Sequence, residues 1–235
     1  MFQARDKALR YVQDYCARYV PMHVTTKHNV NDIHLRKPSF AKTHIQVFNK
    51  DAIDVAHQCV NPLVLILADD VTPGGCVLAG AGMQEESLFR RTALFAHLHP
   101  SMYPLNTSEA LYCKNVPVLL TSEAEGYQVL AASPAQIAFI ACPGLKMPSL
   151  VNGRLTDADA LKLRNKIKLI IAVAQENGHA EVVFGALGCG VWGCPAKHVA
   201  ELFAEVLTEH NGVLSKAYFA ILGSLSNVFT EHIRM

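Results

Sequence analysis

The sequence predicts a single three-layer α/β domain, and three observations lead to that fold class. Segments with the pattern of strands alternate with segments of helical pattern along the 235 residues, which is typical of helices packed on both faces of a sheet. The run 62–68 (PLVLILA) is continuously apolar, as expected for a strand covered on both faces. The composition, with 51% hydrophobic and 17% charged residues, suits one compact domain with a full core.

The N-terminal half begins with a helix. Leu9, Val12 and Cys16 recur at steps of three and four residues, which predicts a helix over 2–19. We expect residues 1–43 to form a helical extension packed on the single domain of 1–235. The further elements expected in this half are a polar loop over 22–43, a strand over 44–49, a short helix over 51–59, the strand over 62–68 and a helix over 84–97.

The C-terminal half continues the alternation. Thr156 is a good N-cap for a helix that runs to about residue 176, with Asp157 and Asp159 in its first turn. Pro195 suits the first position of the next helix, because its fixed φ is compatible with a helix start. The strands expected in this half are 116–120, 128–132, 137–141, 182–186 and 217–222.

The composition argues against several classes of function. A formal net charge of +1 gives no electrostatic basis for nucleic acid as a partner, so sequence-specific nucleic-acid binding is not expected. No apolar run reaches the ~18–20 residues that span a bilayer, and residues 1–20 lack the apolar centre of a secretory signal. Seven scattered cysteines fit reduced thiols better than a disulfide framework. We therefore expect a cytoplasmic or nuclear protein that is not secreted and has no membrane partner.

Two glycine-rich loops each follow an expected strand and precede an expected helix. The first reads TPGGCVLAGAG over 72–82, and the second reads GALGCGVWG over 185–193. At such positions in α/β folds, helix N-termini and free backbone amides gather, and glycine lets the backbone approach an anion closely. The second loop lacks the Lys-Ser/Thr pair of a nucleotide triphosphatase loop. Two such loops in one domain favour a diphosphate or nucleotide ligand over tight packing alone.

Two adjacent carboxylates, Glu85 and Glu86, stand in the first turn of the helix expected after the first loop. Acidic residues favour a helix N-terminus by ~0.3–1 kcal/mol, which alone would explain them. However, Gly80-Ala81-Gly82 precedes them and brings backbone close to whatever the carboxylates face. Neighbouring carboxylates in a partly enclosed site raise one pKa, so that one of them holds a proton for a leaving group. Acid-assisted cleavage of a glycosidic bond requires this arrangement.

These motifs resemble the catalytic signature of the microbial type of the poly(ADP-ribose) glycohydrolase family, which is built on a macrodomain. That family has Pro-Gly-Gly-Gly, a short spacer, Gln-Glu-Glu and often Arg-Arg. The matching residues here are Pro73-Gly74-Gly75-Cys76, the spacer 77–83, Gln84-Glu85-Glu86 and Arg90-Arg91. The second loop resembles the family's Gly-Ala-x-Gly-Cys-Gly-Val-aromatic motif, and weaker similarity covers 43–59, 115–120 and 219–233. The resemblance implies a three-layer, macrodomain-like α/β fold with a mixed central sheet.

The resemblance also implies roles for the matching residues. Glu86 resembles the catalytic acid that protonates the leaving oxygen at the distal ribose and, once ionised, activates the attacking water. Glu85 resembles the partner that hydrogen-bonds the leaving ribose hydroxyl or holds the scissile bond in register. Trp192 matches an aromatic residue that packs against the distal ribose. The other residues expected to bind the ligand or support its loops are Asp69, Gly74, Gly75, Cys76, Gln84, Gly185, Gly188, Cys189, Gly190 and Val191.

The implied function is cleavage of the O-glycosidic bond at the distal ribose of poly- or mono-ADP-ribosylated substrates, by acid/base catalysis without a metal or organic cofactor. The implied partners are ADP-ribose, an ADP-ribosylated protein or poly(ADP-ribose). Three residues depart from the family pattern: Cys76 replaces the third glycine, Asp69 stands in a segment that usually contains asparagine, and Thr72 stands where asparagine is common. These departures keep a second interpretation open, a binding module that recognises ADP-ribose without cleaving it.

Single residues in the two loops also allow other interpretations. Cys189, Cys194 and His198 have the spacing C-x4-C-x3-H without a fourth ligand nearby, which favours structural thiols over a metal site. A cysteine nucleophile at Cys76 or Cys189 would lack a histidine placed by motif to activate it. Trp192 could also belong to the core instead of the ligand site.

Overall fold

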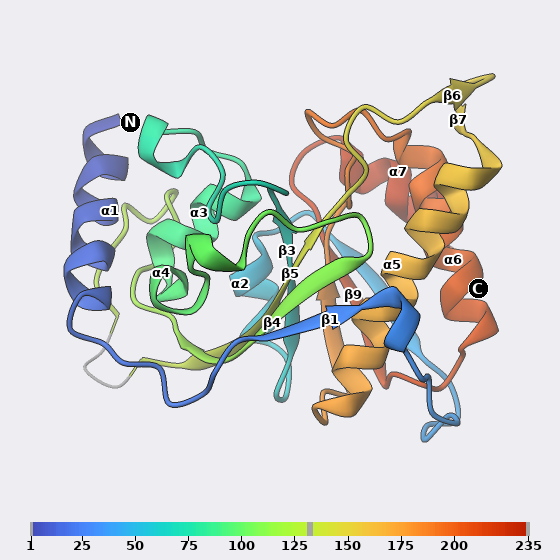
Figure 1. The fold of residues 1–235 in the computed structure, drawn as a ribbon, viewed down its shortest axis with the longest axis horizontal. Helices are drawn as coiled ribbons and strands as arrows, with labels where there is room; N and C mark the ends of the chain where they lie inside the picture. The colour runs from blue at the N-terminus through green and yellow to red at the C-terminus, as the bar shows by residue number, and fades with distance from the viewer. Residues whose placement is uncertain (1, 131–133, 234–235) are drawn as a thin grey trace.

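The computed structural model describes residues 2–130 and 134–233, and it has the three-layer architecture that the sequence predicts. A mixed seven-stranded sheet crosses the middle of the molecule (Figure 1). Its strands are β1 (Thr26–Asn29), β2 (His44–Phe48), β3 (Leu63–Ala68), β4 (Glu109–Pro117), β5 (Gln136–Pro143), β8 (Glu181–Phe184) and β9 (Lys216–Ala220). Their order in the sheet is β1-β4-β5-β3-β8-β9-β2. The pairs β1–β4 and β4–β5 are antiparallel, and the other pairs are parallel.

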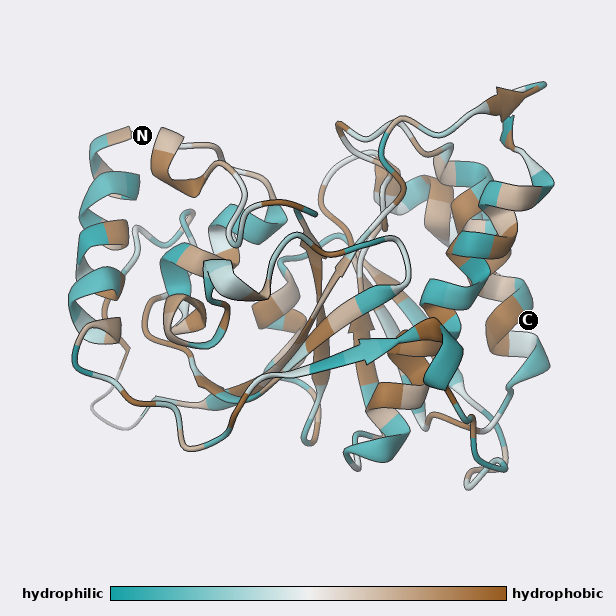
Figure 2. Cartoon of the chain, in the orientation of Figure 1, coloured by the Kyte–Doolittle hydropathy of each residue, from teal (hydrophilic) through white to brown (hydrophobic). Residues whose placement is uncertain are grey.

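Helices cover both faces of this sheet (Figure 1). One face carries α1 (Phe2–Cys16), α2 (Ala52–Ala56), α3 (Gln84–Arg91) and α4 (Leu94–His97). The other face carries α5 (Asp157–Glu176), α6 (Ala196–Glu209) and α7 (Leu225–His232). Apolar residues lie mainly along the central strands, whereas the outward sides of α1 and α5 are hydrophilic (Figure 2). Among the described residues, none of the helices is both long and apolar enough to cross a membrane.

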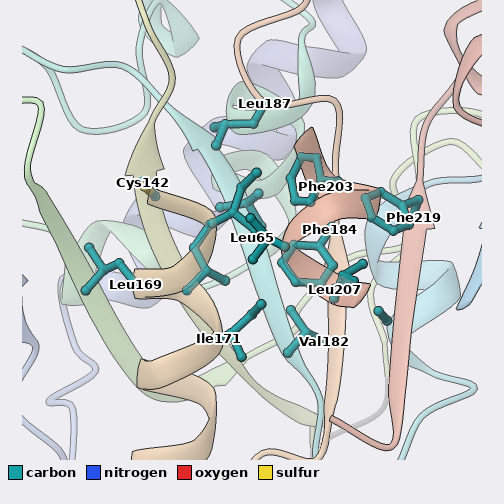
Figure 3. Packing of buried hydrophobic residues seen from close by; sticks show 14 of the residues in the cluster. Leu65, Cys142, Leu169, Ile171, Val182, Phe184, Leu187, Phe203, Leu207 and Phe219 are labelled. Atoms are coloured by element: carbon teal, nitrogen blue, oxygen red, sulfur yellow. The ribbon is translucent and has the colours of Figure 1, made fainter. Parts of the chain in front are cut away.

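Strand β3 is buried on both faces, as its unbroken apolar sequence predicts. Alternate residues of a strand point to opposite faces. Val64 and Ile66 therefore belong to the core beneath α1–α4, and Leu63 and Leu65 to the core beneath α5–α7. In the core beneath α5–α7, Leu65 lies beside Phe184 and side chains of α5, α6 and β9 (Figure 3). Each fully buried aliphatic side chain contributes about 1.5–3 kcal/mol, so this packing fixes the strand from which the site is built.

The expected elements of the central sheet and the main helices are largely confirmed. The helix expected over 2–19 ends at Cys16, and Thr156 caps α5 because its side-chain oxygen accepts a hydrogen bond from the Asp159 amide at 3.3 Å. Pro195 is the N-cap of α6 and not its first residue. The helix expected over 84–97 is instead two helices, α3 and α4.

The interruption between α3 and α4 has a physical reason in the backbone pairing of the residues around it. The Ala93 amide donates to the Pro117 carbonyl at 3.0 Å, and the Arg91 carbonyl accepts from the Leu119 amide at 2.7 Å. These backbone groups therefore pair with the segment after β4, which is distant in sequence, instead of continuing the helix.

Three predictions of local structure were wrong. The loop expected over 22–43 contains β1 and a 3-10 helix over Val30–Asp32. Strand β1 was missed because it is an edge strand with the hydrophilic sequence TKHN, which shows no alternation of apolar residues (Figure 2). The strand expected over 116–120 begins earlier and spans Glu109–Pro117. The strand expected over 128–132 is reduced to a single bridge between Leu120 and Val129, and residues 131–132 lie outside the described part of the chain. The sequence interpretation also missed α7 and the hairpin of β6 (Leu150–Val151) and β7 (Arg154–Leu155).

The centre of the sheet sets the position of the site. Strands β5, β3 and β8 are adjacent and parallel, so their carboxyl ends meet at one edge. The loops that follow them are 144–149, 69–83 and 185–195. Ligands in open α/β sheets bind outside such strand ends. The two glycine-rich loops and the N-terminus of α3 meet at this edge.

Candidate active site

A cavity of about 320 Å³ opens where the three loops meet. It takes residues from the end of β3, from the first glycine-rich loop, from the start of α3 and from the second glycine-rich loop. Its lining is formed by Leu67, Ala68, Asp69, Gly75, Cys76, Ala81, Met83, Gln84, Glu85, Glu86, Gly144, Ala186, Gly188, Gly190, Val191 and Trp192. The lining contains three carboxylates and no cationic side chain, so an anionic ligand would have to be held there by backbone amides.

Gln84 attaches the start of α3 to β3. Its side-chain oxygen accepts from the Leu67 amide at 2.9 Å, and its side-chain nitrogen donates to the Leu65 carbonyl at 2.7 Å. The carboxamide thus satisfies two groups of β3 that a neighbouring strand would otherwise pair. This contact fixes the first turn of α3, and with it the two following carboxylates, against the strand end.

Glu85 is buried, with 4% of its surface exposed, and both of its carboxyl oxygens are bonded to backbone. Oε2 accepts from the Asp69 amide at 2.7 Å, and Oε1 accepts from the Gly74 amide at 3.0 Å. Burial raises the pKa of Glu85 from its ordinary 4.5 to about 8, although the two amides act in the opposite direction and the neighbouring Glu86 adds to the increase. Glu85 is therefore protonated at neutral pH.

Glu86 is also buried, but only one of its oxygens has a partner. Oε1 accepts from the Cys76 amide at 3.1 Å. Oε2 is buried and has no hydrogen-bond partner among the described residues. Glu86 lines the cavity, and its carboxyl therefore combines a position fixed by the Cys76 amide with one oxygen that has no partner within the described fold.

Gly75 allows both carboxylates to approach the first loop. A Cβ at this position would lie 2.8 Å from Glu86 Oε1 and 3.1 Å from Glu85 Oε2. Its φ of +53° also lies in the left-handed region that favours glycine. The glycine in this loop therefore makes room for the protein's own carboxylates.

The second loop has a different backbone arrangement. The amides of Gly188, Gly190, Val191 and Trp192 donate to no acceptor among the described residues. Gly188 has a φ of +76°, and a Cβ there would lie 2.7 Å from Cys194 Sγ. This loop therefore presents unpaired amides at the cavity, which is the arrangement that binds phosphate groups.

Trp192 lies at the edge of the cavity and is partly buried. The ammonium of Lys146 lies 5.5 Å from the centre of its ring, and the same ammonium is 3.2 Å from Asp70. The Trp192 carbonyl accepts from the Met147 amide at 2.9 Å. The indole is thus held between the loops after β5 and β8 and is not part of either main core.

Ten of the residues predicted from the sequence line this cavity together. They are Asp69, Gly75, Cys76, Gln84, Glu85, Glu86, Gly188, Gly190, Val191 and Trp192. Asp69 also stabilises the turn after β3, because its Oδ1 accepts hydrogen bonds from the Val71 and Thr72 amides at 2.9 and 2.8 Å. Part of that side chain is therefore committed to the loop itself.

Three predicted ligand residues are not part of the cavity lining. A Cβ on Gly74 would lie 2.8 Å from the ring of Phe89, so this glycine serves helix packing. A Cβ on Gly185 would lie 3.3 Å from the side chain of Leu67. Cys189 points its thiol at the Leu187 carbonyl, and burial raises the pKa of that thiol well above its usual range. These three positions lie outside the cavity lining, and direct contact between them and a ligand stays a prediction.

The other interpretations of the cysteines find no support in the geometry. The Cys194 thiol donates to the Leu145 carbonyl at 3.3 Å, and His198 Nδ1 accepts from the Leu155 amide at 3.0 Å. These atoms are thus engaged within the fold. Because the Cys189 thiol has a raised pKa, it is a poor source of the thiolate that a nucleophile requires.

Sequence reasoning missed six of the cavity residues, which are Leu67, Ala68, Ala81, Met83, Gly144 and Ala186. Gly144 follows β5, and a Cβ there would lie 2.7 Å from Gly188 Cα, so the loops after β5 and β8 touch backbone to backbone. The signal that could have found it is Pro143-Gly144 at the end of an apolar strand. Met83 lies across the mouth from Gly190, with its methyl group 3.7 Å from a Cβ at that position.

Comparisons with known proteins agree with this geometry. Residues 6–121 match the family model of the microbial-type PARG catalytic domain, and residues 147–203 match that of the macro domain. No curated protein sequence matches the chain.

Solved structures of bacterial poly(ADP-ribose) glycohydrolases (PARG) have the same fold. That of Thermomonospora curvata is 22% identical, with a TM-score of 0.81 over 98% of this chain and 99% of that chain. The same enzyme bound to the inhibitor ADP-HPD gives 0.80 at 22% identity, over 97% and 99% of the two chains. PARG of Deinococcus radiodurans in complex with ADP-ribose gives 0.74 at 22% identity, over 89% and 94%. The chain therefore belongs to the microbial-type PARG catalytic domain family and has the macro domain fold.

Proposed function

We propose that this protein hydrolyses the O-glycosidic bond at the distal ribose of poly- or mono-ADP-ribosylated substrates. One observation carries the proposal: Glu86 keeps a buried, unpartnered oxygen in the same cavity as four unpaired amides of the second loop. The amides would donate hydrogen bonds to the diphosphate of ADP-ribose, and the carboxyl oxygen would transfer a proton at the bond to be cleaved. Membership of the PARG family and the ADP-ribose complex of the Deinococcus radiodurans relative support the same ligand.

The ligand would lie across the cavity from the second loop to the first. Its diphosphate would accept from the amides of Gly188 and Gly190–Trp192, because no cation lines the cavity. Its distal ribose would pack between Gly75 and the Trp192 ring. This orientation would bring the anomeric carbon of the distal ribose to Glu86.

The reaction needs one carboxyl group and one water molecule. The Glu86 carboxyl gives its proton to the leaving oxygen as the bond between that oxygen and the anomeric carbon breaks. Water then attacks the positively polarised carbon and gives a proton to the Glu86 carboxylate. The products are free ADP-ribose and the released alcohol, and Glu86 returns to its starting state. The step uses no metal or organic cofactor.

Glu85 would position the substrate and would not transfer the proton. Both of its oxygens already accept from backbone amides of the first loop. With its pKa raised to about 8 it carries a proton at neutral pH, which removes one negative charge from the cavity and provides a donor to a ribose oxygen. Its bonds to Asp69 and Gly74 also hold the loop that packs against the ribose.

A binding module without turnover is the second candidate, and Cys76 favours it. Its exposed thiol lines the cavity beside Gly75, where the family pattern has glycine, and it narrows the approach to Glu86. The charge of Asp69 in the same lining would also repel a diphosphate that lies too close.

Release of free ADP-ribose distinguishes the two candidates. The two substrates are purified poly(ADP-ribose) and a mono-ADP-ribosylated protein. Each is incubated with the wild-type chain, with Glu86→Gln and with Glu231→Gln. Glu231 is an exposed carboxylate, so its substitution controls for a general effect of charge. We expect the wild type to release ADP-ribose. Glu86→Gln should lower the rate of release by ~10²–10⁴-fold, the range for loss of a general acid, and Glu231→Gln should leave the rate unchanged. Tight ADP-ribose binding without release from either substrate would establish the binding module instead.

A further inference from the structure

We propose that Arg5, on the N-terminal helix α1, is a positioning residue for Glu86. It would act through the segment 76–83, which is the later part of the first glycine-rich loop, leads into α3 and forms one wall of the cavity at Cys76, Ala81 and Met83. The inference rests on the proposed function, because it assigns Glu86 the proton transfer. It gives the helix α1 a part in the reaction, although α1 contributes no residue to the cavity lining.

Arg5 binds two separate parts of the chain. Its Nη1 donates to the Gly80 carbonyl at 2.8 Å, and its Nε and Nη2 donate to the two carboxyl oxygens of Glu123 at 2.8 and 2.9 Å. The guanidinium also lies directly against Gly82, where a Cβ would collide with Nη2. With 14% of the side chain exposed, the Arg5 guanidinium is held between Glu123 and this segment.

A continuous path of hydrogen bonds leads from Arg5 to the carboxyl of Glu86. Arg5 holds the Gly80 carbonyl, and the amide of the next residue, Ala81, donates to the Cys76 carbonyl at 3.3 Å. The Cys76 amide then donates to Glu86 Oε1 at 3.1 Å. Each link shares a peptide unit or a residue with the next. A shift of Gly80 therefore moves the amide that orients Glu86.

The opposite side of the segment is held by a second guanidinium. Arg90 is fully buried and donates to the Ala81 carbonyl. By contrast, the apolar anchoring of the segment is confined to Val77, which is 2% exposed, since Leu78 is 73% exposed and Met83 is 56% exposed. Segments with few buried apolar contacts open locally at low free energy. The two arginines are thus the main contacts that fix the carbonyls of residues 80 and 81.

The test compares Arg5→Met with Arg10→Met in the full chain. Arg10 lies on the same helix, is exposed and has no hydrogen-bond or ion-pair partner in the part of the chain that the structure describes. Hydrogen exchange is followed in peptides that cover 76–83, and kcat is measured beside the Kd of ADP-ribose. We expect faster exchange in 76–83 and a fall in kcat of roughly ten- to hundredfold in Arg5→Met only, since a misplacement of about 1 Å can cost ~10²-fold.

The Kd of ADP-ribose should change by less than about threefold, because the amides of the second loop do not depend on Arg5. Arg5→Lys, which can hold Gly80 or Glu123 but not both, serves as a milder second variant and should give intermediate exchange and kcat. Unchanged exchange in 76–83, or equal losses in Arg5→Met and Arg10→Met, would overturn the proposal. Because exchange is measured without substrate, it tests the contact even if the wild-type protein releases no ADP-ribose.

Discussion

The two glycine-rich loops look alike in sequence but use their backbones in opposite ways. In the first loop, the amides of Gly74 and Cys76 donate to Glu85 and Glu86, so the acceptors they hold belong to the protein. In the second, four amides at 188 and 190–192 have no acceptor among the described residues. A glycine-rich loop at a strand end therefore indicates that an acidic acceptor is close, but the pattern does not tell whether that acceptor is a side chain or a ligand. Substitutions in each loop should separate catalysis from binding.

The largest effect is expected from Gly75→Ala in the first loop. A Cβ there would lie 2.8 Å from Glu86 Oε1, so the carboxyl must move, and the φ of +53° adds backbone strain. We expect kcat to fall by ~10²–10³-fold, as for loss of a preorganised catalytic contact, while ADP-ribose still binds.

Gly153→Ala is a matched control for that substitution, because Gly153 has a φ of +75° and nothing within 4 Å of a Cβ. It should cost ~1–3 kcal/mol of backbone strain at most and leave kcat unchanged. If Gly153→Ala lowers kcat as much as Gly75→Ala, or if Gly75→Ala abolishes ADP-ribose binding, then the assignment of catalysis to the first loop and of ligand binding to the second loop is wrong.

Gly188→Ala in the second loop should show the reverse behaviour. A Cβ there would lie 2.7 Å from Cys194 Sγ, so the loop must shift and its amides lose their common direction. Loss of one charge-assisted hydrogen bond costs ~1.5–3 kcal/mol, which corresponds to roughly ten- to hundredfold weaker ADP-ribose binding in calorimetry. Saturating substrate should restore most of kcat. A large loss of kcat at saturation would show that the second loop also orients the reacting groups.

A third effect is on stability and concerns pH and the proton on Glu85. Its pKa rises from 4.5 to about 8 on folding, so between these values the folded protein keeps a proton that the unfolded chain releases. The contribution of this group to the unfolding free energy is therefore present in full below about pH 4.5 and is lost as pH rises through 8, by at most ~1.4 kcal/mol per pH unit.

Glu85→Gln removes this titration and keeps the shape of the side chain. We expect its unfolding free energy, from denaturant titrations at pH 5 to 8, to fall less steeply with pH than that of the wild type. Glu231→Gln should follow the wild-type slope, because that carboxylate is exposed. Parallel curves for Glu85→Gln and the wild type would mean that Glu85 is ionised in the folded protein.

Much of the site could be predicted because its signals are local in sequence. Gln84, Glu85 and Glu86 follow one another in a single turn of α3, and the glycines beside them are read directly from the chain. Gly144 has a local signal in Pro143-Gly144 after an apolar strand, but its place in the cavity also depends on the adjacency of β5, β3 and β8 in the sheet. The contacts of Arg5 likewise depend on the tertiary fold, because its partners Gly80 and Glu123 are 75 and 118 residues away in the chain.

The fold could be predicted where burial leaves a pattern and was missed where it does not. Strand β3 shows an unbroken apolar run because both of its faces are covered. Strand β1 is polar and lies at the sheet edge, so its pairing with β4 comes from backbone groups that the sequence does not reveal. The end of α3 is likewise set by pairing with residues 117–119, not by a helix-breaking residue.

The bonds from the amides of Asp69, Gly74 and Cys76 to the two glutamates join groups of the same chain, so no ligand is needed to complete them. The cost of bringing two acidic groups together is therefore met once, when the chain folds, and not again in every catalytic cycle. The unbound site should consequently resemble the bound one closely, so a rigid mimic of the oxocarbenium-like sugar would gain affinity over ADP-ribose without any rearrangement of the first loop. Stability and turnover are coupled in this loop, since any change that relaxes the glutamates would make folding easier and catalysis harder.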